Sequence, residues 1–243
     1  MANLKPLEIW KKSLDQTILL AEVREMSEEM SILPVQSSYS LDDGVVEATV
    51  LHKEPLIMRF ERLLTDDECR QLIETASPRL KASKLVNKVV SEIRTSRGMF
   101  FEEEESPFIQ RIERRISQLM NVPIEHAEGL QVLHYGPGQE YKAHHDFFAQ
   151  NSPSARNNRI STLIIYLNDV EEGGETVFPL LQIEVKPKRG AALYFEYFYR
   201  RQALNDLTLH SSVPVVRGEK WVATQWMRRQ RIRKVGLISS SYI

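Results

Sequence analysis

Hydrophobic residues in the first part of the chain recur every three or four positions, the spacing of a helix that buries one face. Segment 4–26 carries such a stripe, at Leu4, Leu7, Trp10, Leu14, Ile18 and Ala21. Its polar face mixes both charges, so we expect the stripe to pack within the chain or against a second copy rather than on a membrane. Turn-forming residues at 37–44 predict a boundary. Residues 1–40 are therefore interpreted as an N-terminal helical extension.

Strand-like hydrophobic runs follow at 45–60, and the pattern then becomes helical. Thr65 and Glu68 have the spacing of a capping box, in which each side chain accepts a hydrogen bond from the other residue's backbone amide. Cys69 falls on the apolar face directly after this cap, which favours a buried structural cysteine over a reactive one. The Ser-Pro pair that begins at Ser77 predicts the end of this helix.

Short mixed runs at 79–101 predict strands, and a second helix is expected to begin with Ser106 as its cap and Pro107 in its first turn. After Val122 nearly the whole pattern is strand, with turn signals at regular intervals. This order of elements predicts an α+β fold, a sandwich or jelly roll buttressed by the preceding helices. The expected strands are 129–135, 139–146, 160–168, 175–178, 182–187, 191–198, 207–211 and 219–228.

Composition narrows the function classes. The 243 residues are 42% hydrophobic, enough for a sizeable core, and the formal net charge of −1 gives no basic field for nucleic acid. A single cysteine excludes an intramolecular disulfide and a multi-cysteine zinc site. The chain lacks the apolar core of a signal peptide and any apolar run of membrane-spanning length. A cytoplasmic protein without membrane or nucleic-acid partners is therefore expected.

The candidate chemistry begins with His144 and Asp146, which lie two residues apart in a predicted strand and so project from one face. An imidazole and a carboxylate placed in this way can ligate one metal ion, although an H-x-D pair alone also fits a polar strand end facing water. His210 supplies a possible third ligand. Ten residues later Lys220 occurs in an otherwise hydrophobic strand, where a lysine is costly unless it meets an anion. A carboxylate-bearing ligand is therefore predicted.

This order of residues, with the sequence NDVEEGGETVFP between the first two ligands and the third, resembles the Fe(II)- and 2-oxoglutarate-dependent dioxygenases. Within them the chain is similar to the prolyl 4-hydroxylase family, especially the stand-alone bacterial enzymes that act on collagen-like peptides. The resemblance runs from about Glu54 to Arg229. It implies a double-stranded β-helix, or jelly roll, in a domain of residues 41–234 followed by a tail at 235–243.

The resemblance also implies an activity. His144, Asp146 and His210 would hold Fe(II), and Lys220 would pair with the distal carboxylate of 2-oxoglutarate. With O2 as oxidant and ascorbate as reductant, such an enzyme hydroxylates C4 of a prolyl residue and releases succinate and carbon dioxide. The residues implied to contact the cosubstrate are Tyr135, Tyr166 and Thr176, and those implied to contact the peptide are Tyr141, Arg159 and Trp226.

Some expectations depend on local geometry. Regular alternation would place Tyr141 on the strand face opposite His144, so a contact with substrate requires a bulge. The polar loop 147–158 is a candidate lid over an extended peptide, or else an ordinary surface loop. His134 and His145 match no ligand position and are interpreted as structural.

Two other functions stay open at this point. One is iron-dependent hydroxylation of a free amino acid or another small molecule. The other is a jelly-roll metal-binding module without turnover, which the complete ligand set and Lys220 disfavour because a binding module does not need a 2-oxoglutarate anchor. The related bacterial enzymes make a homodimer plausible.

Overall fold

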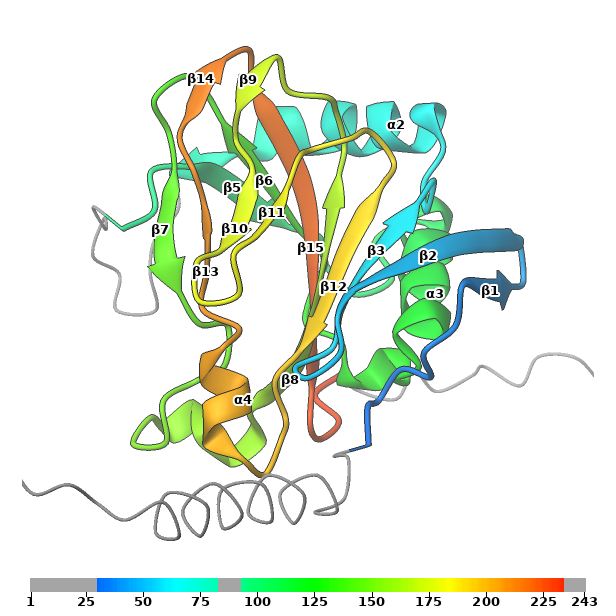
Figure 1. Cartoon of the computed structure of the whole chain (residues 1–243). Coiled ribbons are helices and arrows are strands. Elements are labelled where there is room, and N and C mark those ends of the chain that lie inside the picture. Colours follow the sequence, from blue (N-terminus) through cyan, green and yellow to red (C-terminus); the bar gives the residue numbers. More distant parts are fainter. Residues whose placement is uncertain (1–29, 83–92, 234–243) are drawn as a thin grey trace, which may run out of the picture. The chain divides into compact units, whose positions relative to one another are not determined.

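The computed structural model describes residues 30–82 and 93–233, and Figure 1 shows the described part as two facing sheets with helices on one side. The larger sheet has nine strands in the order β1-β2-β3-β12-β8-β15-β6-β5-β4. In chain order these are Ser38–Leu41, Gly44–His52, Ile57–Glu61, Lys81–Ala82, Arg97–Phe100, Gln131–Tyr135, Arg159–Tyr166, Ala192–Glu196 and Lys220–Arg228.

The smaller sheet faces the large one and has the order β11-β10-β13-β7. Its strands are Tyr141–His144 (β7), Thr176–Phe178 (β10), Ile183–Val185 (β11) and His210–Ser212 (β13). A separate pair joins Glu172–Gly173 (β9) to Val215–Arg217 (β14). All pairings between the described strands are antiparallel. The jelly-roll expectation is confirmed.

Helices α2 (Asp66–Ala76) and α3 (Pro107–Met120) cover the face of the large sheet that points away from the small sheet (Figure 1). Both predicted caps are present: Thr65 and Glu68 form the capping box, and the Ser106 hydroxyl accepts from the amide of Ile109. Leu72 and Ile112 pack with the sheet in one core cluster. No helix in the described ranges is long and apolar enough to cross a membrane.

Cys69 is fully buried in α2, as expected. Burial raises the pKa of its thiol to about 11, so the thiol is protonated at neutral pH and unreactive.

The second core cluster lies between the two sheets and forms the walls of the site. Its aromatic and aliphatic members include Tyr135, Tyr166, Phe178, Phe195 and Val222. Alternation along β8, β12 and β15 sends neighbouring residues to opposite cores, so these central strands are buried on both faces and read as nearly continuous hydrophobic runs.

The compact unit that contains the sheets begins at Ser31, about ten residues before the boundary predicted near residue 40. Strand β1 pairs with β2, with Tyr39 opposite Val46, and Leu33 and Tyr39 are buried in the first core cluster. The amide of Ile32 donates to the buried Glu196 carboxylate at 3.1 Å. The predicted N-terminal helix and the predicted tail lie outside the described residues.

Other differences are local. The predicted strand at 207–211 is preceded by a short helix, α4 (Gln202–Asp206), and the strand itself begins only at His210. The short strands β9 and β14 were not predicted because each has only two or three residues, which is too few to show an alternation.

Candidate active site

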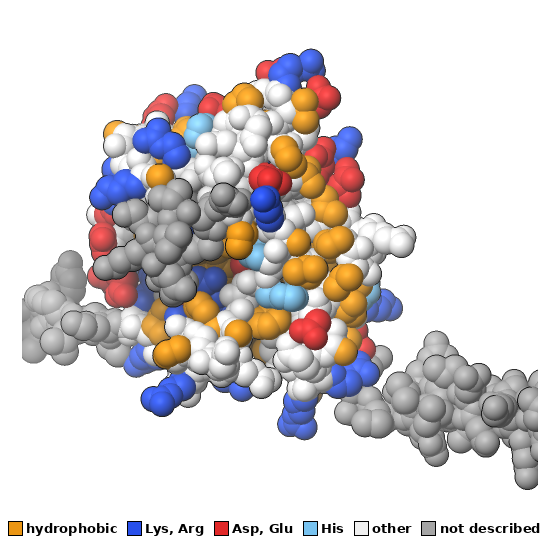
Figure 2. Space-filling model, turned by 90° about the vertical axis from the view of Figure 1, so that its left-hand side faces the viewer, with side chains coloured by type: hydrophobic (Ala, Val, Ile, Leu, Met, Phe, Trp, Pro, Cys, Tyr) orange, Lys and Arg blue, Asp and Glu red, His pale blue; other side chains and the backbone are white. Residues whose placement is uncertain are grey.

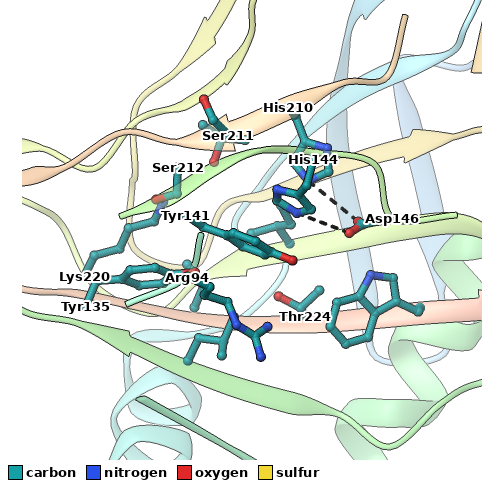
Figure 3. Close-up of a pocket in the computed structure, with 15 residues that line it drawn as sticks. Arg94, Tyr135, Tyr141, His144, Asp146, His210, Ser211, Ser212, Lys220 and Thr224 are labelled. Atoms are coloured by element: carbon teal, nitrogen blue, oxygen red, sulfur yellow. Dashed lines mark hydrogen bonds and ion pairs between the residues drawn. The ribbon is translucent and has the colours of Figure 1, made fainter. Parts of the chain in front are cut away.

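His144, Asp146 and His210 form a group whose ligand atoms all lie within 4.8 Å of one another (Figure 3). His144 ends β7, Asp146 follows two residues later, and His210 begins β13, which pairs with β7 so that the two histidines lie opposite each other. Each Nε2 atom faces the carboxylate of Asp146, at 3.5 Å from His144 and 3.7 Å from His210. Strand pairing therefore brings the third ligand to the first two, although His210 lies 64 positions after Asp146 in the sequence.

Both imidazoles are oriented through their other nitrogen. The Nδ1 of His144 lies 2.9 Å from the Lys142 carbonyl oxygen, and the Nδ1 of His210 lies 3.0 Å from that of Thr208. A carbonyl oxygen only accepts, so Nδ1 carries the proton and the lone pair of Nε2 points into the site. Burial lowers the pKa of His210 to about 4, which leaves it neutral and ready to ligate a metal.

The carboxylate of Asp146 is buried and ionised. Burial alone would raise its pKa, but His210 and His144 hold the pKa of Asp146 well below its usual range. Its Oδ2 atom also accepts a 2.7 Å hydrogen bond from the Thr162 hydroxyl, which in turn shares a hydrogen bond with the Tyr197 hydroxyl. Two imidazoles and one oriented carboxylate on one side of a cavity are the donor set of a non-haem iron site with open positions.

Tyr141 lies on the same side of β7 as His144, and its ring stacks on the imidazole with centroids 3.5 Å apart. The bulge that this placement requires is present. His210 pairs with His144, but Ser212, two residues further along β13, pairs with Tyr141, three residues back along β7. The extra residue in β7 reverses the alternation, and Tyr141 therefore lines the same pocket as the ligand group.

The far end of the pocket contains Lys220, as Figure 3 shows. Its side chain is almost fully buried, and its Nζ donates to the hydroxyl of Ser212 at 2.8 Å. Burial lowers the pKa of Lys220 to about 7, and the charge of Glu175 opposes this shift. A desolvated ammonium at the closed end of a pocket favours binding of a carboxylate there.

The strand parity predicted for β15 is confirmed, because its alternate residues Lys220, Val222, Thr224 and Trp226 all line the pocket. Tyr135 also lines the pocket, opposite Lys220 in the pairing of β6 with β15, and the Lys220 ammonium lies 5.5 Å from its ring. Thr176 lines the wall and accepts a 2.9 Å hydrogen bond from the hydroxyl of Tyr166. Tyr166, for which the resemblance implies a cosubstrate contact, is not among the residues that line the pocket, although its ring lies 5.8 Å from the Lys220 ammonium.

At the other end of the pocket, the guanidinium of Arg159 lies 4.0 Å from the Trp226 ring and donates to the Asp146 carbonyl oxygen at 3.3 Å. Figure 2 views this face, on which histidine side chains lie beside a hollow with hydrophobic and basic side chains around it.

His134 and His145 lie outside the pocket. The first contacts Glu219 at 2.8 Å, and the second contacts the Asp206 carbonyl oxygen at 3.0 Å.

The structure adds pocket residues that the sequence did not single out. The backbone of Arg94 forms an isolated β-bridge with that of Tyr141. Its guanidinium lies 5.2 Å from the Tyr141 ring and lines the pocket. Nothing in its local sequence marks it, because the contact depends on a pairing between distant segments. Ser212 was within reach of prediction: it lies two residues after His210 on β13 and therefore faces the same side.

The comparisons with known proteins agree with this geometry. Residues 130–228 match the family described as the 2OG-Fe(II) oxygenase superfamily. The chain is 38% identical over 205 residues to probable prolyl 4-hydroxylase 10 of Arabidopsis thaliana, covering 74% of this chain and 71% of that protein. Prolyl 4-hydroxylase 1 of the same plant is 38% identical over 208 residues, covering 77% and 74%. The chain belongs to the prolyl 4-hydroxylase family.

A solved structure supports the same relation. The collagen prolyl hydroxylase of Paramecium Bursaria Chlorella virus-1, in complex with 2-oxoglutarate, matches with a TM-score of 0.59 and 32% identity. The match covers 71% of this chain and 95% of the viral one. This prolyl 4-hydroxylase is therefore an iron- and 2-oxoglutarate-dependent dioxygenase, which confirms the resemblance and the enzyme class that the sequence predicted.

In this prolyl 4-hydroxylase, Ser212→Ala is expected to raise the KM for 2-oxoglutarate about three- to tenfold, because the hydroxyl no longer fixes the Lys220 ammonium. The KM for a peptide substrate should change little, since Ser212 lies at the end of the pocket away from Trp226. Steady-state kinetics with each substrate varied in turn checks this. An unchanged KM for 2-oxoglutarate would show that Ser212 has no part in orienting Lys220.

Proposed function

We propose that this enzyme hydroxylates C4 of prolyl residues in collagen-like or proline-rich peptides. His144, Asp146 and His210 hold Fe(II), and Lys220 with Tyr135 and Thr176 holds 2-oxoglutarate. The observation that carries the proposal is that a complete two-histidine, one-carboxylate group and a buried lysine lie in one pocket. A metal-binding module without turnover would not need the buried lysine.

When bound, iron together with 2-oxoglutarate and O2 supplies the oxidising power that converts a C–H bond into C–OH, with succinate and carbon dioxide as the other products. The chain's own residues position the reactants. Thr162 fixes the Asp146 carboxylate, the Lys142 and Thr208 carbonyl groups fix the two imidazoles, and the sheet walls exclude water. Lys220 orients the cosubstrate by its distal carboxylate.

The peptide is proposed to lie across the open end of the pocket, where Tyr141 and Trp226 present aromatic surfaces beside the ligand group. Flat aromatic faces suit the ring of proline, and an extended chain has few internal hydrogen bonds to lose on binding. Loop 147–158 approaches this end through Phe148, whose ring lies 5.0 Å from the Arg159 guanidinium. The side-chain amide of Asn158 ties the two ends of the loop by exchanging two hydrogen bonds with the backbone of Phe148. Its action as a lid stays a prediction.

The decisive experiment measures succinate and peptide mass together. The protein is incubated with Fe(II), 2-oxoglutarate and ascorbate, with and without proline-rich and (Gly-Pro-Pro)-type peptides. We expect peptide-stimulated succinate formation and a gain of one oxygen per hydroxylated proline. Stimulation by free proline or another small molecule but by no peptide would favour the small-molecule alternative, and the absence of both signals would contradict the proposal.

Three further properties belong to this proposal. Ascorbate is the proposed reductant that keeps iron in the Fe(II) state, which repeated turnovers with and without it would test. A homodimer is proposed, with the hydrophobic stripe at 4–26 as its contact, and comparison of the solution mass with that of a shortened chain would test it. A cytoplasmic location is proposed from the sequence, and cell fractionation would test it.

The low pKa of Lys220 predicts a pH dependence for cosubstrate binding. In the free protein the ammonium has a pKa of about 7, whereas the bound carboxylate raises that pKa by stabilising the charged form. Above pH 7 binding must therefore take up a proton, so the KM for 2-oxoglutarate should rise by up to about tenfold per pH unit. Below pH 7 it should level off. Lys220→Arg, which stays charged, should lose this dependence, and an equal slope in both proteins would contradict the assignment.

A further inference from the structure

Two arginines share one carboxylate beside the open end of the pocket. Arg159 binds Glu128 through two hydrogen bonds of 2.7 and 2.8 Å, and the Nε of Arg228 lies 2.7 Å from the same Glu128 Oε1 atom. Both guanidinium groups pack on the ring of Phe148, at 5.0 and 4.7 Å from its centroid. Arg159 and Arg228, called here the guanidinium pair, form a compact cluster with Glu128 and this ring.

Strand geometry places the guanidinium pair next to the reacting centre. Lys220, Thr224 and Trp226 occupy alternate positions of β15 on its pocket face, and Arg228 is the next position in that row. Across the sheet, a bulge in β8 brings Arg159 directly opposite Arg228. Arg159 in turn lies on the Trp226 ring and donates to the carbonyl of Asp146.

The charges of this cluster do not balance. Like charges directly opposite each other on neighbouring strands are destabilising, and among the described residues Glu128 is the one carboxylate that contacts either guanidinium. One positive charge therefore remains beyond this ion pair, because the other carboxylate that acts on Arg159, Asp146, belongs to the metal-ligand group. Burial, and then the charge of Arg159, lower the pKa of Arg228, with Glu128 opposing, so the second guanidinium is held at a cost.

The guanidinium pair remains reachable by a ligand. The side chains of Arg159 and Arg228 are 16% and 17% exposed. The Nη1 of Arg228 donates to the Asn157 carbonyl at 2.6 Å, and its Nη2 atom has no hydrogen-bond partner in the parts of the chain that the structure describes. A planar donor with a free edge and an excess charge is suited to a carboxylate.

We propose that the guanidinium pair binds an acidic side chain of the substrate, an aspartate or glutamate close to the target proline. The inference rests on the proposed function, since it names a feature of the peptide that the same site hydroxylates. The carboxylate completes the charge balance that Glu128 leaves open. Substrate preference is then set by charge beside the proline as well as by the proline itself.

The experiment uses paired peptides with amidated C-termini, each with one proline and with aspartate or asparagine scanned across the positions on either side of it. Amidation removes the terminal carboxylate as a competing source of the same chemistry. For at least one position we expect kcat/KM for the aspartate peptide to exceed that for its asparagine partner about tenfold. The preference should weaken as salt is raised.

Variants then identify the group responsible. Arg228→Gln should bring the ratio between the paired peptides close to one, and Arg228→Lys should retain part of it because the charge remains. Arg229→Gln is the matched control: it removes the same charge from the neighbouring, exposed residue, and it should keep the wild-type ratio. Thermal melting of each variant reports folding.

The outcomes separate the two proposals. Equal kcat/KM values for both members of every pair in the wild-type enzyme would overturn the acidic-residue inference while leaving prolyl hydroxylation intact, and so would an unchanged ratio in Arg228→Gln. If no peptide is hydroxylated, the proposed function fails. Fluorescence anisotropy of the labelled peptides then still decides the inference, because tighter binding of the aspartate peptides supports it and equal binding overturns it.

Discussion

Replacing Asp146 with alanine is expected to abolish peptide hydroxylation, with kcat/KM lowered by more than about a thousandfold. The carboxylate is the one anionic member of the ligand group and is nearly fully buried. Its loss leaves two imidazoles with 4.3 Å between ring centroids. Such a pair binds Fe(II) too weakly to hold it with the open positions that 2-oxoglutarate and O2 require.

Thr162→Val provides the graded control for this prediction. It keeps all three ligands but removes the 2.7 Å hydrogen bond to Asp146, so activity should fall about 10- to 100-fold, the usual effect of losing an outer partner of a metal ligand. Metal content after desalting should drop to background in Asp146→Ala and only partly in Thr162→Val. Normal activity or metal retention in Asp146→Ala would show that the ligand group is misassigned.

His144 and Asp146 could be predicted as a pair because they are two residues apart, although β7 ends at His144 and Asp146 lies beyond the strand. The alternate residues of 220–226 do share one face of a strand, which is how they line the pocket. His210 was found through the resemblance, since only the pairing of β13 with β7 brings it to the other two. Residues close together in the sequence could therefore be assigned to the site from local patterns, whereas His210 required the family pattern.

Tyr141 shows where the regular alternation of side chains along a strand fails as a guide. Alternation alone puts its ring on the wrong face, and the sequence could say only that a bulge was required. The partner strand β13 sets the bulge. His210 and Ser212 are two residues apart, but they pair with His144 and Tyr141, which are three residues apart. A register of this kind depends on contacts between segments far apart in the chain, which local patterns do not encode.

Arg94, Glu128 and Arg228 were beyond sequence reasoning for the same reason, and Arg159 was reached only through the family resemblance. Glu128, Arg159 and Arg228 are separated by 31 and 69 residues, and each alone has the pattern of an ordinary surface charge. The N-terminal boundary is a different case. Strand β1 has only four residues, of which Tyr39 alone is buried, and this is too little hydrophobic pattern to distinguish a docked edge strand from a linker.

Lys220→Ala is expected to raise the KM for 2-oxoglutarate about a hundredfold or more. Truncating one partner of a buried, hydrogen-bonded charge pair costs about 2–5 kcal/mol, largely because the other charge is left desolvated and unpaired. Here the unpaired charge would be the distal carboxylate of the cosubstrate, enclosed by Tyr135 and Thr176 at the closed end of the pocket. The ligand group is untouched, so metal content should remain that of the wild type.

Lys188→Ala is the matched control for Lys220. It removes a lysine that is 58% exposed and paired with Glu61, so the KM for 2-oxoglutarate should stay at its wild-type value. Titration of the metal-loaded protein with 2-oxoglutarate, followed by its charge-transfer absorption, measures binding without turnover. A wild-type affinity in Lys220→Ala would mean that the distal carboxylate is held elsewhere in the pocket, with Arg94 as the next cation that lines it. The loss of affinity that we expect would instead make Lys220 the residue that distinguishes a dicarboxylate cosubstrate from a simple keto acid.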